Sequence, residues 1–225
     1  MSATLQIPVE ISFTVSADLV GSTFHTLQRD IRRESRRALL HALQTAVAEM
    51  EKALLASPLR CTQCQHPMRS RGRTVRRVVT VFGPVALSRR KYRCGACGAV
   101  RRPLDEWLGL VAGTEYTAAV REQALYLAAD LSYERAADVL RHVGGIGMSG
   151  RQIQHLLREE SCHIEAALGT PGDDLEPALR RRFRRAGKDG AQRIVQLRQL
   201  KTSGLWEAYW ARRFAAERST PAASR

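Results

Sequence analysis

The chain has 225 residues, a formal net charge of +14 and a pI near 10.6, and its length is enough for one or two small domains. No apolar run approaches the roughly 18 residues that a membrane span needs. Residues 1–30 lack the basic and apolar regions of a secretory signal, so we expect a cytoplasmic protein with reduced thiols and no membrane partner.

The positive charge is concentrated in two blocks. Residues 60–103 carry +12 and residues 177–214 carry +9, whereas residues 1–59 are neutral and residues 105–165 carry −5. Of the 36 basic residues, 32 are arginine, a bias that base composition of the source explains without explaining where the charges sit. Clustering of this kind indicates a polyanionic partner.

The N-terminal segment, residues 1–59, predicts one strand and one long helix. Residues 4–15 alternate between apolar and polar side chains, which indicates a half-buried strand, and Pro8 favours a sheet edge. Apolar residues at three- and four-residue steps predict a helix over residues 22–56. The charged first half of this helix is either a solvated face or a contact with a partner helix, including a second copy of the chain.

Two Cys-x-x-Cys pairs follow, Cys61 with Cys64 and Cys94 with Cys97. In a reducing compartment such pairs are more often metal ligands than disulfides, and four thiolates satisfy the tetrahedral preference of zinc. We therefore predict one structural Zn²⁺ held by Cys61, Cys64, Cys94 and Cys97. A redox motif would need a βαβ context that is absent here. Unpaired thiols, or a ligand role for His66, are further possibilities.

The 29 residues between the pairs are typical of a hairpin. Residues 73–82 and 85–92 have strand patterns separated by Gly83 and Pro84. The hairpin brings the cysteine pairs together and completes a zinc ribbon over residues 60–103. Gly98 suits the turn after the second pair, whereas Gln65 stands at the corresponding place of the first, which makes that turn the weaker match.

The segment 104–165 predicts a short linker and three helices. Residues 103–110 are expected to pack Trp107 against the rest of the protein. Helices are predicted over residues 117–130 and 133–142, the second with Ser132 as its N-cap, and a third begins at an N-cap formed by Ser149 with Gln152. The apolar stripe of the third helix is expected at Ile153, Leu156 and Leu157. Cys162, on the third helix, is expected to be buried or half-buried and is assigned no role.

A short helix, a glycine turn and a second helix are typical of a helix-turn-helix. Arg and Gln are side chains that bond base edges in the major groove. The alternative is a small helical bundle with a solvated polar face, which the negative charge of residues 105–165 favours. The side chains predicted to face DNA from the third helix are Arg151, Gln152, Gln154, His155 and Arg158.

The remaining segments are a basic linker over residues 166–185, a helical segment over 186–216 and a disordered tail over 217–225. The helical segment is expected to break at Ser203 and Gly204. The predicted fold class is mostly α with a small β zinc ribbon, a multi-module α+β chain. Phosphate contacts are predicted for the ribbon side chains Arg69, Arg71, Arg73, Arg76, Arg77, Arg89, Arg90 and Lys91, and for the linker side chains Arg181, Arg182, Arg184 and Arg185.

The order of these motifs resembles that of the ISKra-type insertion-sequence transposases. The resemblance is carried by the cysteine pairs, by the hairpin motif Thr80-Val81-Phe82-Gly83-Pro84-Val85, by Pro103-Leu104-Asp105, by Ser132-Tyr133-Glu134-Arg135 and by Ser203-Gly204-Leu205-Trp206. It covers about residues 60–165 and 186–214.

This resemblance implies a catalytic RNase H-like domain with a DDE carboxylate triad between the two parts. Only about twenty residues stand there, too few for such a domain, so no catalytic residue is assigned. The resemblance thus implies an internally deleted transposase that binds double-stranded DNA of the terminal inverted repeats and associates with the nucleoid. The alternatives are a regulator or inhibitor that binds repeat DNA or an intact transposase, and an enzyme active only in a complex.

Overall fold

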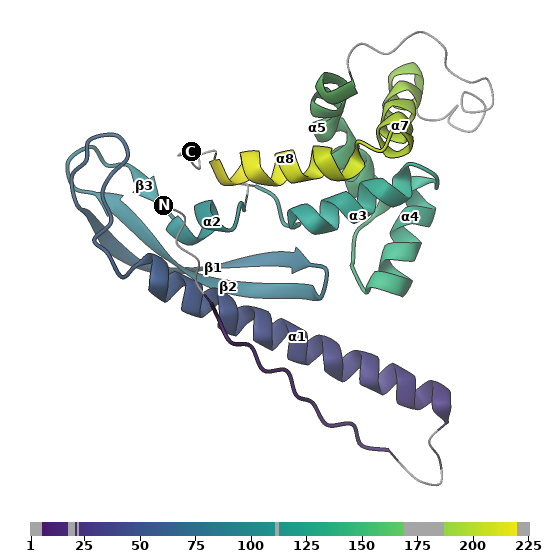
Figure 1. Cartoon of the computed structure of the whole chain (residues 1–225), viewed down its shortest axis with the longest axis horizontal. Helices are drawn as coiled ribbons and strands as arrows, with labels where there is room; N and C mark the ends of the chain where they lie inside the picture. Colours follow the sequence, from purple (N-terminus) through teal and green to yellow (C-terminus); the bar gives the residue numbers. More distant parts are fainter. Residues whose placement is uncertain (1–5, 18–20, 22, 111–112, 169–186, 220–225) are drawn as a thin grey trace. The chain divides into compact units, whose positions relative to one another are not determined.

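The computed structural model describes residues 6–17, 21, 23–110, 113–168 and 187–219 (Figure 1). The chain divides into two compact units: unit 1 is Met1–Glu115 with Arg218–Arg225, and unit 2 is Tyr116–Glu217. Most of the predicted linker 166–185 and of the predicted tail 217–225 lies outside the described residues. None of the helices in the described ranges is both long and apolar enough to cross a membrane.

Unit 1 combines one long helix with a small antiparallel sheet. Its elements are α1 (Phe24–Leu54), β1 (Met68–Thr80), β2 (Gly83–Cys94), β3 (Val100–Arg101) and α2 (Pro103–Trp107), and the strand order is β1-β2-β3. Since unit 2 is built from helices, the predicted class of a mostly helical chain with a small β element is confirmed.

The hairpin β1–β2 has the alternation that its sequence predicts. Thr80 pairs with Gly83, so Val81 and Phe82 form the turn, and Gly83 has a φ of +125° that favours glycine. Val85 and Leu87 are buried, whereas their neighbours on the strand are exposed. A bulge between Ser70 and Arg73 shifts the register, and it changes which side chains share a face beyond that point.

The buried face of the hairpin forms the core of unit 1 with α1 and α2. Val78, Val85 and Leu87 of the hairpin pack with Val47 of α1 and Leu104 of α2. In Figure 1, α1 runs along the hairpin. Burying these side chains is the main stabilising contribution that holds the helix to the sheet.

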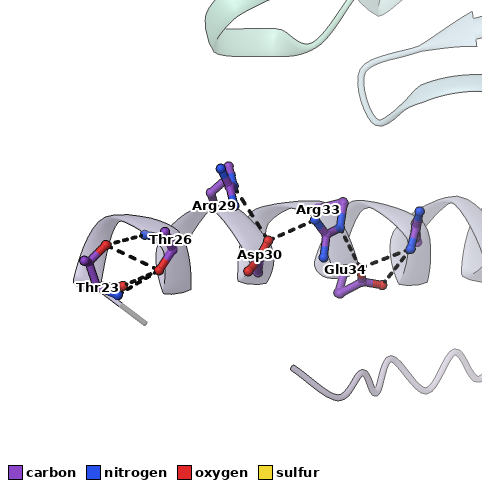
Figure 2. Close-up of polar contacts among 7 residues, drawn as sticks. Thr23, Thr26, Arg29, Asp30, Arg33 and Glu34 are labelled. Atoms are coloured by element: carbon purple, nitrogen blue, oxygen red, sulfur yellow. Dashed lines mark hydrogen bonds and ion pairs between the residues drawn. The ribbon is translucent and has the colours of Figure 1, made fainter. Parts of the chain in front are cut away.

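The first half of α1 is held mainly by contacts within the helix (Figure 2). Thr23 and Thr26 form a capping box, with Thr26 N donating to Thr23 Oγ1 at 3.2 Å and Thr23 N donating to Thr26 Oγ1 at 2.9 Å. Asp30 and Glu34 pair with neighbouring arginines, including Arg33 at 2.9 Å and 2.8 Å. Each such exposed pair contributes little by itself, because water and salt screen the charges.

Two predictions for unit 1 are wrong. Residues 6–17 form no strand, and Val9, Ile11 and Phe13 are 46%, 46% and 44% exposed. Alternation specifies which side chains share a face, but a strand also needs backbone partners, and no described strand pairs with this segment. Trp107 is also 47% exposed, since α2 buries Leu104 in its place.

Unit 2 contains six helical elements in the described residues. They are α3 (Ala118–Ala128), α4 (Tyr133–Val139), the π-helical turn η1 (Leu140–Gly144), α5 (Gly150–Leu168), α7 (Gly187–Thr202) and α8 (Trp206–Ser219). Helix α5 packs against α3, α4 and α7. Its apolar stripe is buried as predicted, at Ile153, Leu156 and Leu157.

The predicted helix boundaries in unit 2 are confirmed at three places. Ser132 accepts a hydrogen bond from Arg135 N at 3.3 Å. Ser149 accepts from Gln152 N at 3.3 Å while Ser149 N donates to Gln152 Oε1 at 2.8 Å, which completes the predicted capping box. The break between α7 and α8 falls at Gly204, which has a φ of +74°.

One carboxylate lies inside the core of unit 2. Glu160, on the apolar stripe of α5, is 2% exposed and accepts from Arg121, Arg213 and Tyr209 at 2.9–3.3 Å. Burial alone would raise the pKa of Glu160, but Arg213, Tyr209 and Arg121 outweigh it and lower the pKa. Cys162 is exposed, so the prediction that it is buried or half-buried is wrong.

The start of α5 approaches the start of α4 closely. A Cβ atom at Gly150 would lie 3.1 Å from Glu134 N and 3.1 Å from Tyr133 C, and backbone atoms cannot rotate away as a side chain would. Gly150 therefore sets the distance between the two helices that flank the glycine turn.

We expect Gly150→Ala to lower the free energy of unfolding of unit 2 by about 1–3 kcal/mol, because the added methyl group forces α4 and α5 apart. Urea unfolding followed by fluorescence of the buried Trp206 and Trp210 measures this. Gly147→Ala is the matched control, since nothing lies within 4 Å of its Cβ position. Equal effects of the two substitutions would contradict the close approach.

Candidate metal centre and basic surfaces

The two cysteine pairs form turns with matching hydrogen bonds. Gln65 N donates to Cys61 O at 3.0 Å and Gly98 N donates to Cys94 O at 3.2 Å. Each first cysteine also donates its backbone N–H to the residue that closes its turn, at 2.9 Å in the first turn and 2.8 Å in the second. The two turns therefore have the same backbone hydrogen-bond pattern. The first turn precedes β1 and the second follows β2.

The residue after each second cysteine has a left-handed backbone. Gly98 has a φ of +76° and Gln65 has a φ of +58°, the latter being the one non-glycine residue with a positive φ in the described chain. The first turn thus has the same conformation as the second, although glutamine costs about 1–2 kcal/mol there relative to a right-handed conformation.

The four sulfur atoms converge at the end of the hairpin, as predicted. Cys61 Sγ lies 3.5 Å from Cys97 Sγ, and Cys64 Sγ lies 3.4 Å from Cys94 Sγ and 3.6 Å from Cys97 Sγ. All four atoms lie within 4.8 Å of one another. Four thiolates at about 2.3 Å from a tetrahedral zinc ion would be about 3.8 Å apart, so the separations suit one metal ion.

The cluster is enclosed on one side and open on the other. Cys61 and Cys94 are buried beside Met68, with Tyr92 packed against them, whereas Cys97 is exposed. His66 is not part of the cluster, and its Nδ1 lies 3.1 Å from Cys64 O. The donor set is therefore four sulfurs, which soft metal ions prefer.

Backbone N–H groups aim at all four sulfurs. At Cys64 and Cys97 the N–H groups of His66 and Ala99 are outweighed by neighbouring sulfurs and burial, which raise the pKa, whereas at Cys61 and Cys94 the pKa is lowered. The N–H groups of Cys97 and Ala96 lower the pKa of Cys94 to about 6 although burial opposes them. The N–H groups of Cys64 and Gln63 lower the pKa of Cys61 in the same way. These donors stabilise thiolates, the form in which cysteine binds a metal ion.

Four protein ligands fill a tetrahedral coordination shell, so this arrangement suits a structural metal and leaves no position for a substrate. Within the described ranges, these cysteines are the one group of side chains placed to hold a metal ion. What the metal would do is hold the two turns together and thereby close the hairpin.

Two of the arginines predicted to contact phosphate lie on the buried face of the hairpin. The side chains of Arg76 and Arg89 are 12% and 13% exposed, and both pair with Asp105 of α2. Arg76 also donates to the backbone of Leu110 and Thr114. These two arginines join the hairpin to α2 and are not surface cations.

The other predicted ribbon contacts are more exposed, and three of them stand in like-charged cross-strand pairs. Arg73 lies directly opposite Arg90 and Arg69 lies directly opposite Arg93. Glu51 of α1 compensates the first pair by binding the Arg73 guanidinium and accepting from Arg90 N at 2.8 Å. Arg71 and Arg77 are exposed and Lys91 is half-buried.

The pair Arg69 and Arg93 has no acidic partner in the described part of the chain. Like charges directly opposite each other destabilise a sheet. Arg93 was missed by the sequence analysis because its position opposite Arg69 follows only from the register after the bulge. The signal in the sequence was its place in a stretch without acidic residues.

The predicted contacts of α5 lie mostly on its exposed side. Arg151, His155 and Arg158 are exposed and recur at four- and three-residue steps, so they form one stripe. His155 Nδ1 lies 3.4 Å from a Glu159 oxygen. Gln152 is exposed, but its Oε1 accepts a hydrogen bond from Ser149 N in the capping box. Gln154 is half-buried.

The linker arginines predicted to bind phosphate, Arg181, Arg182, Arg184 and Arg185, lie outside the described residues.

Two buried carboxylates were missed by the sequence analysis. Asp105 pairs with arginines in the core of unit 1, and Glu160 accepts hydrogen bonds in the core of unit 2. Glu160 had a signal in the sequence, since it interrupts the apolar stripe of α5 at a core position; Asp105 had none.

No family model and no curated protein matches the sequence.

We expect Gln65→Gly to raise the free energy of unfolding of the metal-loaded protein by about 0.5–1 kcal/mol, because glycine adopts a positive φ without strain. Urea unfolding followed by circular dichroism measures the change. Gln63→Gly, in the same turn with a negative φ, is the control and should lower stability. A loss of stability in both variants would contradict the left-handed turn.

Proposed function

We propose that the chain is a DNA-binding protein built on a structural zinc ribbon. The observation that carries the proposal is the set of exposed arginines on a hairpin whose whole segment, residues 60–103, has no acidic residue. The four-sulfur cluster supports zinc as the metal, because four thiolates are the donor set of structural zinc sites.

The charge of this surface favours a polyanion over an acidic protein patch. Arg69 and Arg93 place two guanidiniums on adjacent strands, and strands lie about 4.8 Å apart. Guanidinium groups donate in a fork that matches phosphate oxygens, and a row of them along a hairpin matches the regular charges of a DNA backbone. Binding would relieve the repulsion that the free protein carries.

Helix α5 supplies a second surface of suitable chemistry. Its exposed stripe, Arg151, His155 and Arg158, begins at the N-terminal turn of the helix that follows a glycine turn. Recognition helices read base edges from this end. In DNA complexes, phosphate contacts position the protein and base contacts give sequence specificity. We propose that the hairpin makes the phosphate contacts and that α5 makes the base contacts.

The resemblance to ISKra-type transposases extends the proposal to the origin of the chain. Under it, the protein keeps the DNA-recognition parts of a transposase without the DDE catalytic core, binds terminal inverted repeats and associates with the nucleoid in the cytoplasm. DNA binding on its own does not depend on this origin, and the two are tested separately by comparing repeat DNA with unrelated duplexes.

Zinc is tested by metal analysis of the purified protein. We expect one zinc ion per chain, loss of that zinc in Cys64→Ser, and cobalt absorption typical of tetrahedral thiolate coordination after replacement. Removal of zinc by a chelator should loosen the hairpin and weaken DNA binding together, because metal binding contributes folding free energy directly. Cys162→Ser is the control and should keep the zinc. Folded protein with no bound metal would disprove the zinc ribbon.

DNA binding is tested by fluorescence anisotropy with duplex DNA at several salt concentrations. For Arg69→Gln with Arg93→Gln we expect weaker binding to all duplexes and a log–log salt slope shallower by about 0.9 for each phosphate that is no longer neutralised. The control is Arg37→Gln with Arg212→Gln, which removes the same charge from α1 and α8. Equally weakened binding in both double variants would show that net charge alone governs binding and would refute a hairpin interface.

A further inference from the structure

Unit 1 buries an excess of positive charge where the hairpin meets α2. Arg76 and Arg89 share one oxygen, Oδ2 of Asp105, with Arg76 Nη1 at 3.3 Å from it. Arg102 stands close enough for its charge to act on both arginines. Two guanidiniums therefore share a single carboxylate while a third acts on both of them, which leaves an excess of positive charge in a partly buried site.

The same place holds a group of polar atoms without hydrogen-bond partners. Among the described residues, the buried side-chain atoms that lack such a partner include Arg89 Nε, Arg102 Nε and Asp105 Oδ1. Another is Oγ1 of Thr74, the residue directly opposite Arg89. Isolated orphan atoms occur in many proteins, but a group of them indicates a ligand or water that completes their hydrogen bonds.

The energetics of the arginines are consistent with a missing counter-charge. Burial, together with the charges of Arg76 and Arg102, lowers the pKa of Arg89 to about 10. Burial and the charge of Arg102 also lower the pKa of Arg76. The charged forms of both guanidiniums are thus less stable here than in water, even with Asp105 beside them.

Water and an oxyanion would complete this site differently. Water molecules satisfy the hydrogen bonds of Arg89 Nε, Arg102 Nε and Thr74 Oγ1 but leave the excess positive charge uncompensated. An oxyanion accepts from all three donors and also neutralises the charge, whereas the acceptor Asp105 Oδ1 is completed by water or by a protonated phosphate oxygen. Thr74 and Arg102 are each half-buried, so parts of both side chains reach solvent while the three donor atoms themselves are covered.

We propose that Thr74, Arg89 and Arg102 form a binding site for a phosphate group, with Asp105 holding Arg76 and Arg89 in place. This inference goes beyond the proposed function, because a discrete phosphate site of this kind does not require DNA binding. Two sources offer the same chemistry: free inorganic phosphate, and a phosphodiester of the DNA backbone. In either case the bound group stabilises the junction between the hairpin and α2.

The test uses the full-length, metal-loaded protein in a buffer free of phosphate and sulfate. Thermal unfolding is measured while sodium phosphate is added, with sodium chloride at matched ionic strength as the reference. We expect a saturable rise of the midpoint with phosphate that chloride does not produce. Arg102→Gln should weaken phosphate affinity by about 10- to 100-fold, which corresponds to the removal of one charge-assisted hydrogen bond.

Arg77→Gln is the matched control, because it removes the same charge from an exposed position of β1 and should keep the phosphate response. Thr74→Val keeps the charge and removes one donor, so it should weaken the response even if Arg102→Gln fails to fold. Without phosphate, Arg102→Gln should be at least as stable as the unaltered protein, because it removes repulsion. An unchanged phosphate response in folded Arg102→Gln or in Thr74→Val would overturn the proposal.

A second arm identifies the source. Arg102→Gln is titrated with duplex DNA in phosphate-free buffer, and Arg37→Gln, which removes the same charge from α1, is the reference. A phosphate response together with equal duplex affinities of Arg102→Gln and Arg37→Gln assigns the site to free phosphate. A weaker duplex affinity of Arg102→Gln than of Arg37→Gln assigns it to the DNA backbone. No response to phosphate and no difference between the variants on DNA would overturn the site while leaving the proposed DNA-binding function intact.

Discussion

The convergence of four cysteine sulfurs is the constraint on which the hairpin depends. The chain enters β1 from one turn and leaves β2 into the other, and both turns repeat the same hydrogen bonds. Because the sulfurs lie 3.4–3.6 Å apart in the closest pairs, one metal ion bound to them would hold the ends of the two strands in register at a place where few apolar side chains are buried. The rest of unit 1 then follows, since a hairpin with a fixed register has one face for α1 and α2 to cover.

Unit 1 divides its arginines between two faces with different tasks. Arg76 and Arg89 lie on the covered face, and both pair with Asp105 of α2, so they stabilise the fold. Those on the exposed face keep their charge available, and only Arg73 among the opposed pairs is compensated, by Glu51. Residues 60–103 contain no acidic side chain, so their acidic partners come from α1 and α2, as Glu51 and Asp105. These carboxylates are too few to neutralise the arginines on either face of the hairpin.

Much of the local structure could be predicted from the sequence. The hairpin, the serine caps of α4 and α5, the glycine break before α8 and the convergence of the cysteines all follow from patterns of a few residues, and each is found. The errors lie where a pattern needed a distant partner. Residues 6–17 alternate as a strand does but have no neighbour to bond with in the described sheet, and Trp107 is apolar but stands on a short helix that buries Leu104.

The amino-acid sequence by itself determined the donor set of the candidate metal centre and the sign of the hairpin's charge, because ligand spacing and residue type are local properties. Only the tertiary structure decided which arginines are exposed. That choice depends on the bulge between Ser70 and Arg73, which sets the faces of the strands, and on where α1 and α2 place Glu51 and Asp105. Pairings across 22 to 39 residues are set by packing, and no short motif encodes them.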